Sequence, residues 1–330
     1  MFNPFIMYKK TFLLLFVTFS LQVVIAQSKK GLTYQADTSF TKYQAVKWAL
    51  SQSPNAKLAI AKDIKSISIK ENIKYTTEDG MDLMLDIFSP INKKNAPCLI
   101  ILHGGGWRSG DRTHHHEMAK VLASRGYVVV TPSYRLSTHA LYPAAMVDAK
   151  TAIRWTRANA QFLEINPEKI ALAGFSAGGQ MAALVGTTND ETLYDKSETL
   201  KNISSKVASV IDIDGILAYI HTESGEGDDS RNTSAATYYF GFSKTEKPEL
   251  WNEASALNHV SAGDPPILFI NSSQERMHAG REDMIKKLNG FGIYSEVHTF
   301  NAPHTFCMLE EWFLPTIDLM DKFLIKTLKP

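Results

Sequence analysis

Apolar residues follow two different rhythms along this chain. Between residues 66 and 90 they largely alternate with polar residues on either side of a turn at 77–80, which predicts an antiparallel hairpin. Beyond residue 98, short apolar runs alternate with segments of helical spacing. Strands are predicted at residues 99–102, 127–131, 170–173, 207–213, 267–270 and 296–300, and helices at 116–124, 144–163, 178–185 and 313–328. This alternation predicts an α/β fold, in which a mostly parallel sheet is covered by helices on both faces.

Three stretches do not fit this alternation. Residues 27–65 are mixed and polar, with one short helix expected around 43–50, and we interpret them as an N-terminal arm that precedes a domain at 66–330. Residues 187–206 are polar. Residues 216–258 combine acidic residues and glycines with aromatic residues. Insertions in such sheets emerge near the strand ends, so 216–258 is expected to be a cap-like insertion that forms part of a binding wall.

The N-terminus has the pattern of a secretory signal peptide. Lys9 and Lys10 precede an uncharged apolar run of about 15 residues, which ends in the small and compact residues of Val24-Ile-Ala26. The run is shorter than the roughly 20 residues that span a bilayer as a helix. We therefore expect residues 1–26 to be cleaved off, no stable membrane anchor, and a periplasmic or extracellular protein.

Charge, cysteine content and histidine pattern limit the ligands and cross-links expected of this chain. The formal net charge is +1, so nucleic acid is not an expected partner. The two cysteines, Cys98 and Cys307, are expected to be buried free thiols. The run of histidines at 114–116 does not predict a metal site, because adjacent residues on a helix diverge and no acidic or thiol partner is evident. No metal or cofactor is expected.

A serine lies in the sequence context of a nucleophile elbow. Gly174-Phe-Ser-Ala-Gly178 directly follows an apolar strand and directly precedes a helix. In that context a strained turn lifts the serine hydroxyl above the sheet, so Ser176 is the expected nucleophile. The helix that starts behind it directs backbone N–H groups and the positive end of its dipole toward a developing anion.

Two further segments complete the expected constellation. Leu102-His-Gly-Gly-Gly-Trp107 ends the first central strand, and its glycines let the backbone approach a substrate carbonyl closely. The N–H groups of Gly105 or Gly106, together with that of Ala177, are the expected oxyanion hole. His304 follows the last predicted strand and is the expected general base, because chain order places the base there.

The motifs His103-Gly-Gly-Gly-Trp107 and Gly174-Phe-Ser-Ala-Gly-Gly179 resemble those of the hormone-sensitive-lipase-like branch of α/β hydrolases. Within this branch the chain is most similar to the feruloyl and acetyl xylan esterase-like group, over roughly residues 66–330. The resemblance implies an α/β-hydrolase fold and a serine carboxylesterase that needs no cofactor. It also implies a polysaccharide or oligosaccharide ester as substrate, with acetyl or feruloyl groups on a plant polysaccharide such as xylan.

The acid that orients the histidine is less well defined. The family resembled usually places an aspartate a few residues beyond the strand at 267–270, but this chain has none there. Glu275 falls at that place and is the predicted acid, because a glutamate can also orient a histidine. Asp214 is the first alternative, followed by Glu282 and Asp283.

The substrate is indicated only by residue types. Guanidinium groups suit carboxylates, so Arg108, Arg276 and Arg281 would favour a uronate substrate such as pectin if they face the cleft. Surface salt bridges are the alternative explanation for these arginines. Trp107 and Trp251 are predicted either to stack on sugar rings or to pack in the core. A pectin methyl esterase, a peptidase of the same fold and an inactive carbohydrate-binding relative are the alternative functions.

Overall fold

A computed structural model describes residues 31–51, 54–62, 64–189 and 191–328 of the protein. The predicted signal peptide, residues 1–26, lies outside the described residues. Among the helices that are described, none is both long enough and apolar enough to cross a membrane.

The centre of the molecule is a mixed sheet whose strands, across the described residues, lie in the order β1-β2-β4-β3-β5-β6-β7-β8. β1 and β2 form the predicted hairpin, and β2 is also antiparallel to β4. All further neighbours in the sheet are parallel, which confirms the predicted mostly parallel architecture. The bounds are β1 (Ile67–Glu78), β2 (Met81–Pro90), β3 (Ala96–Leu102), β4 (Val128–Pro132), β5 (Ile165–Phe175), β6 (Ser209–Ile213), β7 (Ile267–Asn271) and β8 (Ser295–Thr299).

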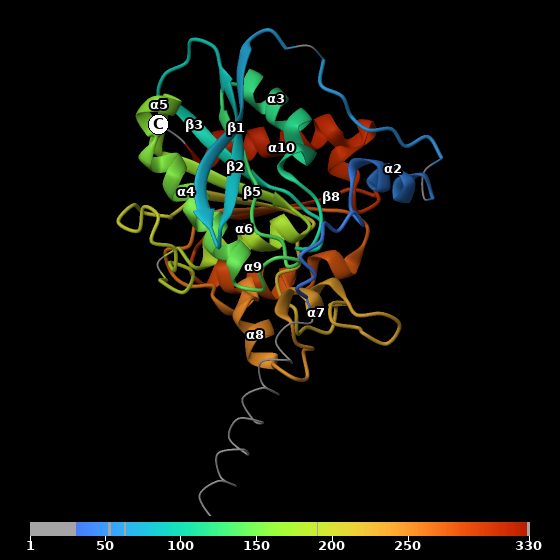
Figure 1. Ribbon diagram of the computed structural model, residues 1–330. Helices are drawn as coiled ribbons and strands as arrows, with labels where there is room; N and C mark the ends of the chain where they lie inside the picture. The colour runs from blue at the N-terminus through green and yellow to red at the C-terminus, as the bar shows by residue number, and fades with distance from the viewer. Residues whose placement is uncertain (1–30, 52–53, 63, 190, 329–330) are drawn as a thin grey trace, which may run out of the picture.

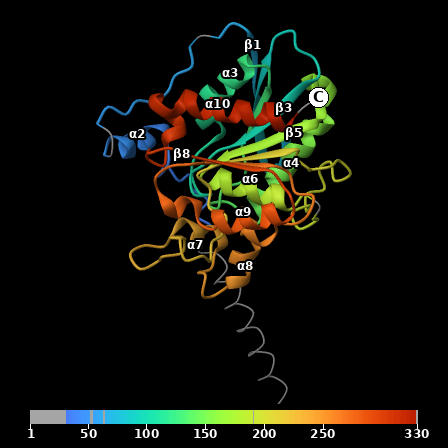
Figure 2. The same cartoon turned by 180° about the vertical axis from the view of Figure 1, so that it is seen from behind.

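Helices cover both faces of this sheet (Figures 1 and 2). One face packs against α3 (His116–Ser124) and α10 (Glu310–Thr327), and the other against α4 (Ala144–Ala158), α6 (Ala177–Thr187) and α9 (Arg281–Gly290). The shorter helices are α2 (Lys42–Leu50), α5 (Ala160–Leu163), α7 (Ala235–Phe240) and α8 (Pro248–Glu253). The helix predicted at 144–163 is divided, because α4 ends at Ala158 and α5 begins at Ala160.

The apolar strands are apolar throughout because both of their faces are buried. In β3 the side chains of Cys98, Ile100 and Leu102 join the core beneath one face, and Leu99 and Ile101 join the core beneath the other. Such two-sided burial requires consecutive apolar residues instead of alternation. Cys98 and Cys307 are buried free thiols, as expected.

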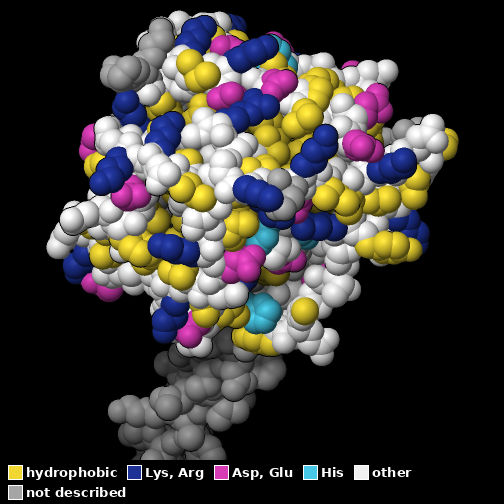
Figure 3. Space-filling model, turned by 90° about the horizontal axis from the view of Figure 1, so that it is seen from above, with side chains coloured by type: hydrophobic (Ala, Val, Ile, Leu, Met, Phe, Trp, Pro, Cys, Tyr) yellow, Lys and Arg dark blue, Asp and Glu magenta, His cyan; other side chains and the backbone are white. Residues whose placement is uncertain are grey.

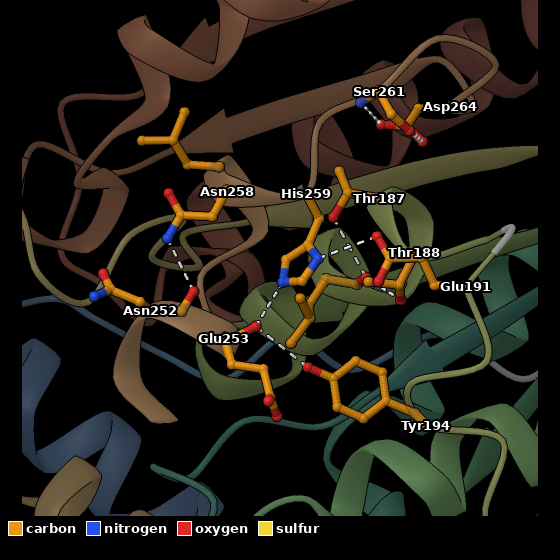
Figure 4. A network of polar contacts seen from close by, with 12 residues as sticks. Thr187, Thr188, Glu191, Tyr194, Asn252, Glu253, Asn258, His259, Ser261 and Asp264 are labelled. Atoms are coloured by element: carbon orange, nitrogen blue, oxygen red, sulfur yellow. Dashed lines mark hydrogen bonds and ion pairs between the residues drawn. The ribbon is translucent and has the colours of Figure 1, made fainter. Parts of the chain in front are cut away.

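A polar network fixes the end of the 216–258 segment against the polar stretch 187–206, which follows α6 (Figure 4). The His259 ring donates its Nε2–H to the Glu253 carbonyl oxygen at 2.7 Å, and its Nδ1 lies 3.2 Å from Glu191 Oε1. Tyr194, from the polar stretch 187–206, donates its hydroxyl to the same carbonyl oxygen at 3.3 Å. These contacts therefore hold the stretches 187–206 and 216–258 together.

The surface charge is mixed in sign. On the face drawn in Figure 3, lysine and arginine side chains lie among aspartate and glutamate side chains and between apolar ones. This interspersed arrangement agrees with a formal net charge of +1 for the whole chain. A mixed surface of this kind produces no strong field of one sign on that face.

Candidate active site

Ser176 occupies a tight turn between β5 and α6. Its backbone has φ 56° and ψ −119°, a conformation that costs about 1–3 kcal/mol for a residue with a side chain. The turn is held from behind, because the Ser176 N–H donates to the Ile213 carbonyl oxygen at 2.8 Å. A Cβ atom on Gly174 would overlap the Gly178 carbonyl, and one on Gly178 would overlap the Leu102 carbonyl. The two glycines of the motif are therefore required by close backbone approach.

The structure brings Ser176 and His304 together, as predicted. His304 Nε2 lies 2.9 Å from Ser176 Oγ, and His304 Nδ1 lies 2.7 Å from Asp214 Oδ2. A carboxylate can only accept a hydrogen bond, so Nδ1 carries the proton and Nε2 is left to accept from the serine hydroxyl. The Asp214 side chain is fully buried, whereas that of His304 is 16% exposed toward the cleft.

Asp214 is held in place by the ends of two neighbouring strands. It directly follows β6 with φ 55°, and its N–H donates to the Ile270 carbonyl oxygen at 2.9 Å. Its second carboxylate oxygen, Oδ1, accepts a hydrogen bond from the Ser272 N–H at 2.8 Å. With His304 on the other oxygen, both carboxylate oxygens are partnered and the side chain has one orientation.

The prediction that Glu275 supplies the acid is wrong. Glu275 is exposed and begins a single 3₁₀ turn, Glu275–His278, while Asp214 already occupies Nδ1 of the histidine. Of the segment just after β7, the Ser272 N–H contacts the triad by donating to the aspartate. The other two alternative acids have different partners. The Glu282 carboxylate pairs with the Arg281 guanidinium, and Asp283 Oδ2 lies 3.3 Å from His221 Nε2.

The glycine loop borders the same cavity as the serine. Ser176, Ala177, Gly105, Gly106 and His304 all line a cavity of about 250 Å³. Gly105 has φ 121° and Gly106 has φ 59°, and both values favour glycine. Among the described residues, the N–H groups of Gly105, Gly106 and Ala177 donate no hydrogen bond within the protein. These donors are therefore free to bind an oxyanion beside Ser176.

His103 lies behind the glycine loop and not in the cavity. Its Nδ1 lies 2.8 Å from the Gly104 carbonyl oxygen, and its ring stacks on Tyr134 with centroids 4.2 Å apart. Burial lowers the pKa of His103 to about 4, so the ring is neutral at physiological pH. The histidine therefore supports the loop without carrying charge into it.

Both tryptophans that were candidates for sugar binding pack in the core. The Trp107 side chain is 4% exposed, donates its Nε1–H to Gln180 Oε1 at 3.0 Å and stacks on Tyr239. Trp251 is fully buried against Phe240. Trp251 does not line the cavity, so its prediction as a substrate-binding residue is wrong. Trp107 does line the cavity, but at 4% exposure it offers little ring surface to a sugar.

The three candidate arginines have different surroundings. Arg276 lines the cavity, is 54% exposed and has its Nη1 3.4 Å from Glu226 Oε1. Arg108 also lines the cavity, but its Nε donates to Asp37 Oδ2 at 3.0 Å and its guanidinium lies over the Tyr238 ring. Arg281 lies outside the cavity lining and donates to Asn271 Oδ1 at 2.7 Å, so its prediction as a cleft residue is wrong.

Two parts of the cavity wall are formed by residues that the sequence analysis did not single out. Glu226, from the 216–258 segment, faces the cavity, and burial raises its pKa while Arg276 and His304 counteract that rise. Phe40 and Trp48, from the N-terminal arm, form another part of the wall. The arm is fastened there because the Phe40 N–H donates to Ser109 Oγ at 2.7 Å. A polar arm gives no sequence signal for this long-range contact.

Comparison with known proteins gives a family and several relatives. The model of the BD-FAE family matches residues 85–279. The chain is 30% identical over 191 residues to esterase LipC of Mycobacterium tuberculosis, an alignment that covers 55% of this chain and 45% of the relative. It is 34% identical over 145 residues to an arylesterase of Saccharolobus solfataricus, covering 44% and 46% of the two chains. The chain therefore spans about half the length of the curated relatives it matches.

Solved structures show the same architecture over most of the chain. The butyrate-bound esterase Est2 of Thermogutta terrifontis is 25% identical, with a TM-score of 0.64, and the match covers 80% of this chain and 95% of that one. A truncated carbohydrate esterase from gut microbiota is 21% identical, with a TM-score of 0.64 and coverage of 81% and 99%. Together with the strand order, these likenesses show the predicted α/β-hydrolase fold.

Proposed function

The chain belongs to the BD-FAE family, and from this premise we propose that it hydrolyses carboxylic esters with Ser176, His304 and Asp214 as its catalytic triad. One observation supports the proposal most directly. The chain of contacts from Asp214 Oδ2 through the imidazole to Ser176 Oγ has lengths of 2.7 and 2.9 Å, which are hydrogen-bonding distances. A serine with a base in contact, and a carboxylate that orients the base, is the arrangement that activates a hydroxyl for attack.

The proposed reaction proceeds through an acyl-enzyme. His304 Nε2 takes the proton from Ser176 Oγ as this oxygen bonds to the ester carbonyl carbon. Asp214 stabilises the resulting imidazolium through Nδ1, and the N–H groups of the glycine loop and Ala177 stabilise the oxyanion. His304 then gives its proton to the leaving alkoxide oxygen. Water, deprotonated by His304, attacks the acyl-enzyme, and the carboxylic acid leaves as Ser176 regains its proton.

We propose ester-decorated plant polysaccharide, with acetyl or feruloyl groups, as the natural substrate. One structural neighbour is named as a carbohydrate esterase, and the relatives are named as esterases. The cavity combines apolar side chains with the charged pair of Glu226 and Arg276, which suits a substrate with both apolar and hydroxyl-bearing parts. Glu226 neutralises the arginine and repels a carboxylate, so the pair weighs against an anionic uronate at this position.

The experiment that tests the proposal compares hydrolysis of p-nitrophenyl acetate by the wild type and by Ser176→Ala. The wild type should turn the ester over, and the variant should retain at most a few per cent of that rate with an unchanged circular dichroism spectrum. A wild type without esterase activity, or a variant that keeps it, contradicts the proposal. Acetylated xylan, feruloylated arabinan and methylated pectin then separate the substrate classes, and methylated pectin should be the poorest of the three.

A further inference from the structure

A second cavity lies beside the one that contains the serine. It has a volume of about 240 Å³ and is lined by Trp48, Gln274, Arg276, Pro303, His304 and Thr305, among others. We call it the flanking cavity, and we call the cavity of about 250 Å³ that contains Ser176 the oxyanion-side cavity. Three residues line both: Trp48, Arg276 and His304. The two cavities therefore adjoin at these three residues, one of which is the expected general base.

The reaction assigns one half of an ester to each cavity. The carbonyl carbon bonds to Ser176 Oγ while its oxygen faces the N–H groups of the glycine loop, so the acyl half stays in the oxyanion-side cavity. The leaving oxygen must receive its proton from His304 Nε2, so the alcohol half lies on the side of the imidazole. Neither the serine nor the glycine loop lines the flanking cavity, whereas His304 does. The alcohol half is thus directed there.

The lining of the flanking cavity suits a sugar ring. Trp48 is 49% exposed, in contrast to the buried Trp107 and Trp251, and so offers a ring surface to a ligand. The apolar C–H face of a pyranose can cover such a ring and remove apolar area from water. The Gln274 amide and the Arg276 guanidinium supply donors for the hydroxyl groups at the sugar's edge.

Trp48 is held in place before any ligand binds. Helix α2 is capped by Thr41, whose Oγ1 accepts from the Gln44 N–H at 3.2 Å, and its Ala45 and Ala49 are buried. The Trp48 ring contacts Phe40, with centroids 5.8 Å apart. A ring already fixed in its bound position loses little freedom when a ligand stacks on it.

We propose that the flanking cavity binds a sugar ring that is the alcohol half of the ester, stacked on Trp48 and hydrogen-bonded by Gln274 and Arg276. This inference rests on the proposed esterase function and deepens it. It selects esters in which the sugar supplies the alcohol, as in acetylated or feruloylated glycans. In a methyl uronate the sugar is the acyl half and the alcohol is methanol, which would leave the flanking cavity empty.

The experiment measures the ratio of kcat/KM for an acetylated xylo-oligosaccharide to kcat/KM for ethyl acetate. Both esters have the same acyl group, but only the first has a sugar as its alcohol. In Trp48→Ala this ratio should fall about tenfold, equal to about 1.4 kcal/mol, mainly through a higher KM for the oligosaccharide. Trp48→Phe should restore most of the ratio, because a smaller aromatic face remains.

Tyr43→Ala is the matched control. Tyr43 lies on the same helix, is 73% exposed and lines neither cavity, so its loss should leave the ratio unchanged. If Trp48→Ala does not fold, Gln274→Ala, which changes another residue of the flanking cavity, should lower the ratio about threefold, by loss of one hydrogen-bonding group.

Three results overturn the inference. The first is an unchanged ratio in a folded Trp48→Ala or in Gln274→Ala, and the second is a wild type that prefers a methyl-esterified galacturonate oligomer. In both cases ester hydrolysis itself persists, and the proposed function stands. The third is a wild type that hydrolyses neither ester, in which case the proposed function fails and the inference fails with it.

Discussion

Replacing Asp214 by asparagine removes one charge from the catalytic site and leaves its shape almost unchanged. The Ser272 N–H donates to Oδ1 of the aspartate at 2.8 Å, and the same N–H would hold the carbonyl oxygen of an asparagine. The asparagine NH₂ group would then face His304 Nδ1, where Oδ2 now lies at 2.7 Å. Because the NH₂ group can only donate, Nδ1 must accept, and the imidazole proton moves to Nε2. In that tautomer His304 cannot take the proton from Ser176.

The expected loss is large because tautomer control and imidazolium stabilisation disappear together. In triads of this kind such a change costs up to about ten-thousandfold in turnover, which corresponds to roughly 5.5 kcal/mol in the activation barrier. Asp214 is fully buried, so no water replaces the lost carboxylate. We therefore expect Asp214→Asn to reduce kcat by at least a thousandfold, with little change in KM.

The assay follows initial rates of p-nitrophenyl acetate hydrolysis, with Ser176→Ala as the background. Glu275→Gln is the matched control, because it removes one exposed carboxylate that has no contact with His304, and its rate should stay within about twofold of the wild type. The reasoning is refuted if Asp214→Asn keeps a tenth or more of the wild-type rate. It is equally refuted if Glu275→Gln loses as much activity as Asp214→Asn.

Three further predictions concern stability. Gly174→Ala should lower the free energy of unfolding by about 3 kcal/mol, because its Cβ would overlap the Gly178 carbonyl. The control Gly290→Ala should not lower it, because a Cβ there would contact no neighbouring atom. Equal urea midpoints for the two variants would contradict this prediction. Because burial lowers the pKa of His103 to about 4, the unfolded chain takes up a proton near pH 6.5 that the folded chain refuses. The free energy of unfolding should therefore fall by roughly 3 kcal/mol through this residue as the pH drops from 6.5 toward 4. In His103→Gln the free energy of unfolding, measured with urea at each pH, should depend less on pH over this range. An unaltered pH dependence in the variant argues against a buried neutral ring. Trp251→Ala should cost about 4 kcal/mol of stability as a core truncation, and a stable variant with selective loss of glycan-ester activity would instead restore its role in substrate binding.

The parts of the site that lie in short motifs could be predicted from the sequence. Ser176 and its two glycines belong to one turn, whose geometry depends on neighbours only two residues away. His304 follows β8 by a few residues, and β8 runs parallel to β5 through β6 and β7, so the loop after β8 leaves the same edge of the sheet as Ser176. For both residues, their position in the sequence relative to a predicted strand was sufficient to predict their place in the site.

The acid could not be chosen from chain order alone. Asp214 follows β6 and Glu275 follows β7, and the two strands are parallel neighbours that end at the same edge of the sheet. The choice depends on the φ of 55° at Asp214 and on the Ser272 N–H that holds its carboxylate. Neither feature has a sequence signature.

The aromatic wall was misjudged for a related reason. Residue type shows that a tryptophan prefers to be covered, but it does not show which tryptophans the fold leaves partly uncovered. Trp251 lies in the insertion that was expected to form the binding wall, yet it is fully buried. Trp48 lies in a polar arm, and it reaches the cavity because Phe40 and Ser109, 69 residues apart, are joined by hydrogen bonds.

Covalent labelling tests most directly whether Ser176 is an activated nucleophile. The protein is treated with a fluorophosphonate, which reacts with serines whose proton is removed by a neighbouring base, and the digest is analysed by mass spectrometry. One phosphonyl group per chain is predicted, on the peptide that contains Ser176, with esterase activity lost in proportion and with labelling slowed strongly in His304→Ala. A chain that stays unlabelled, or one that carries the label on a different residue while Ser176 remains free, would contradict the proposed triad.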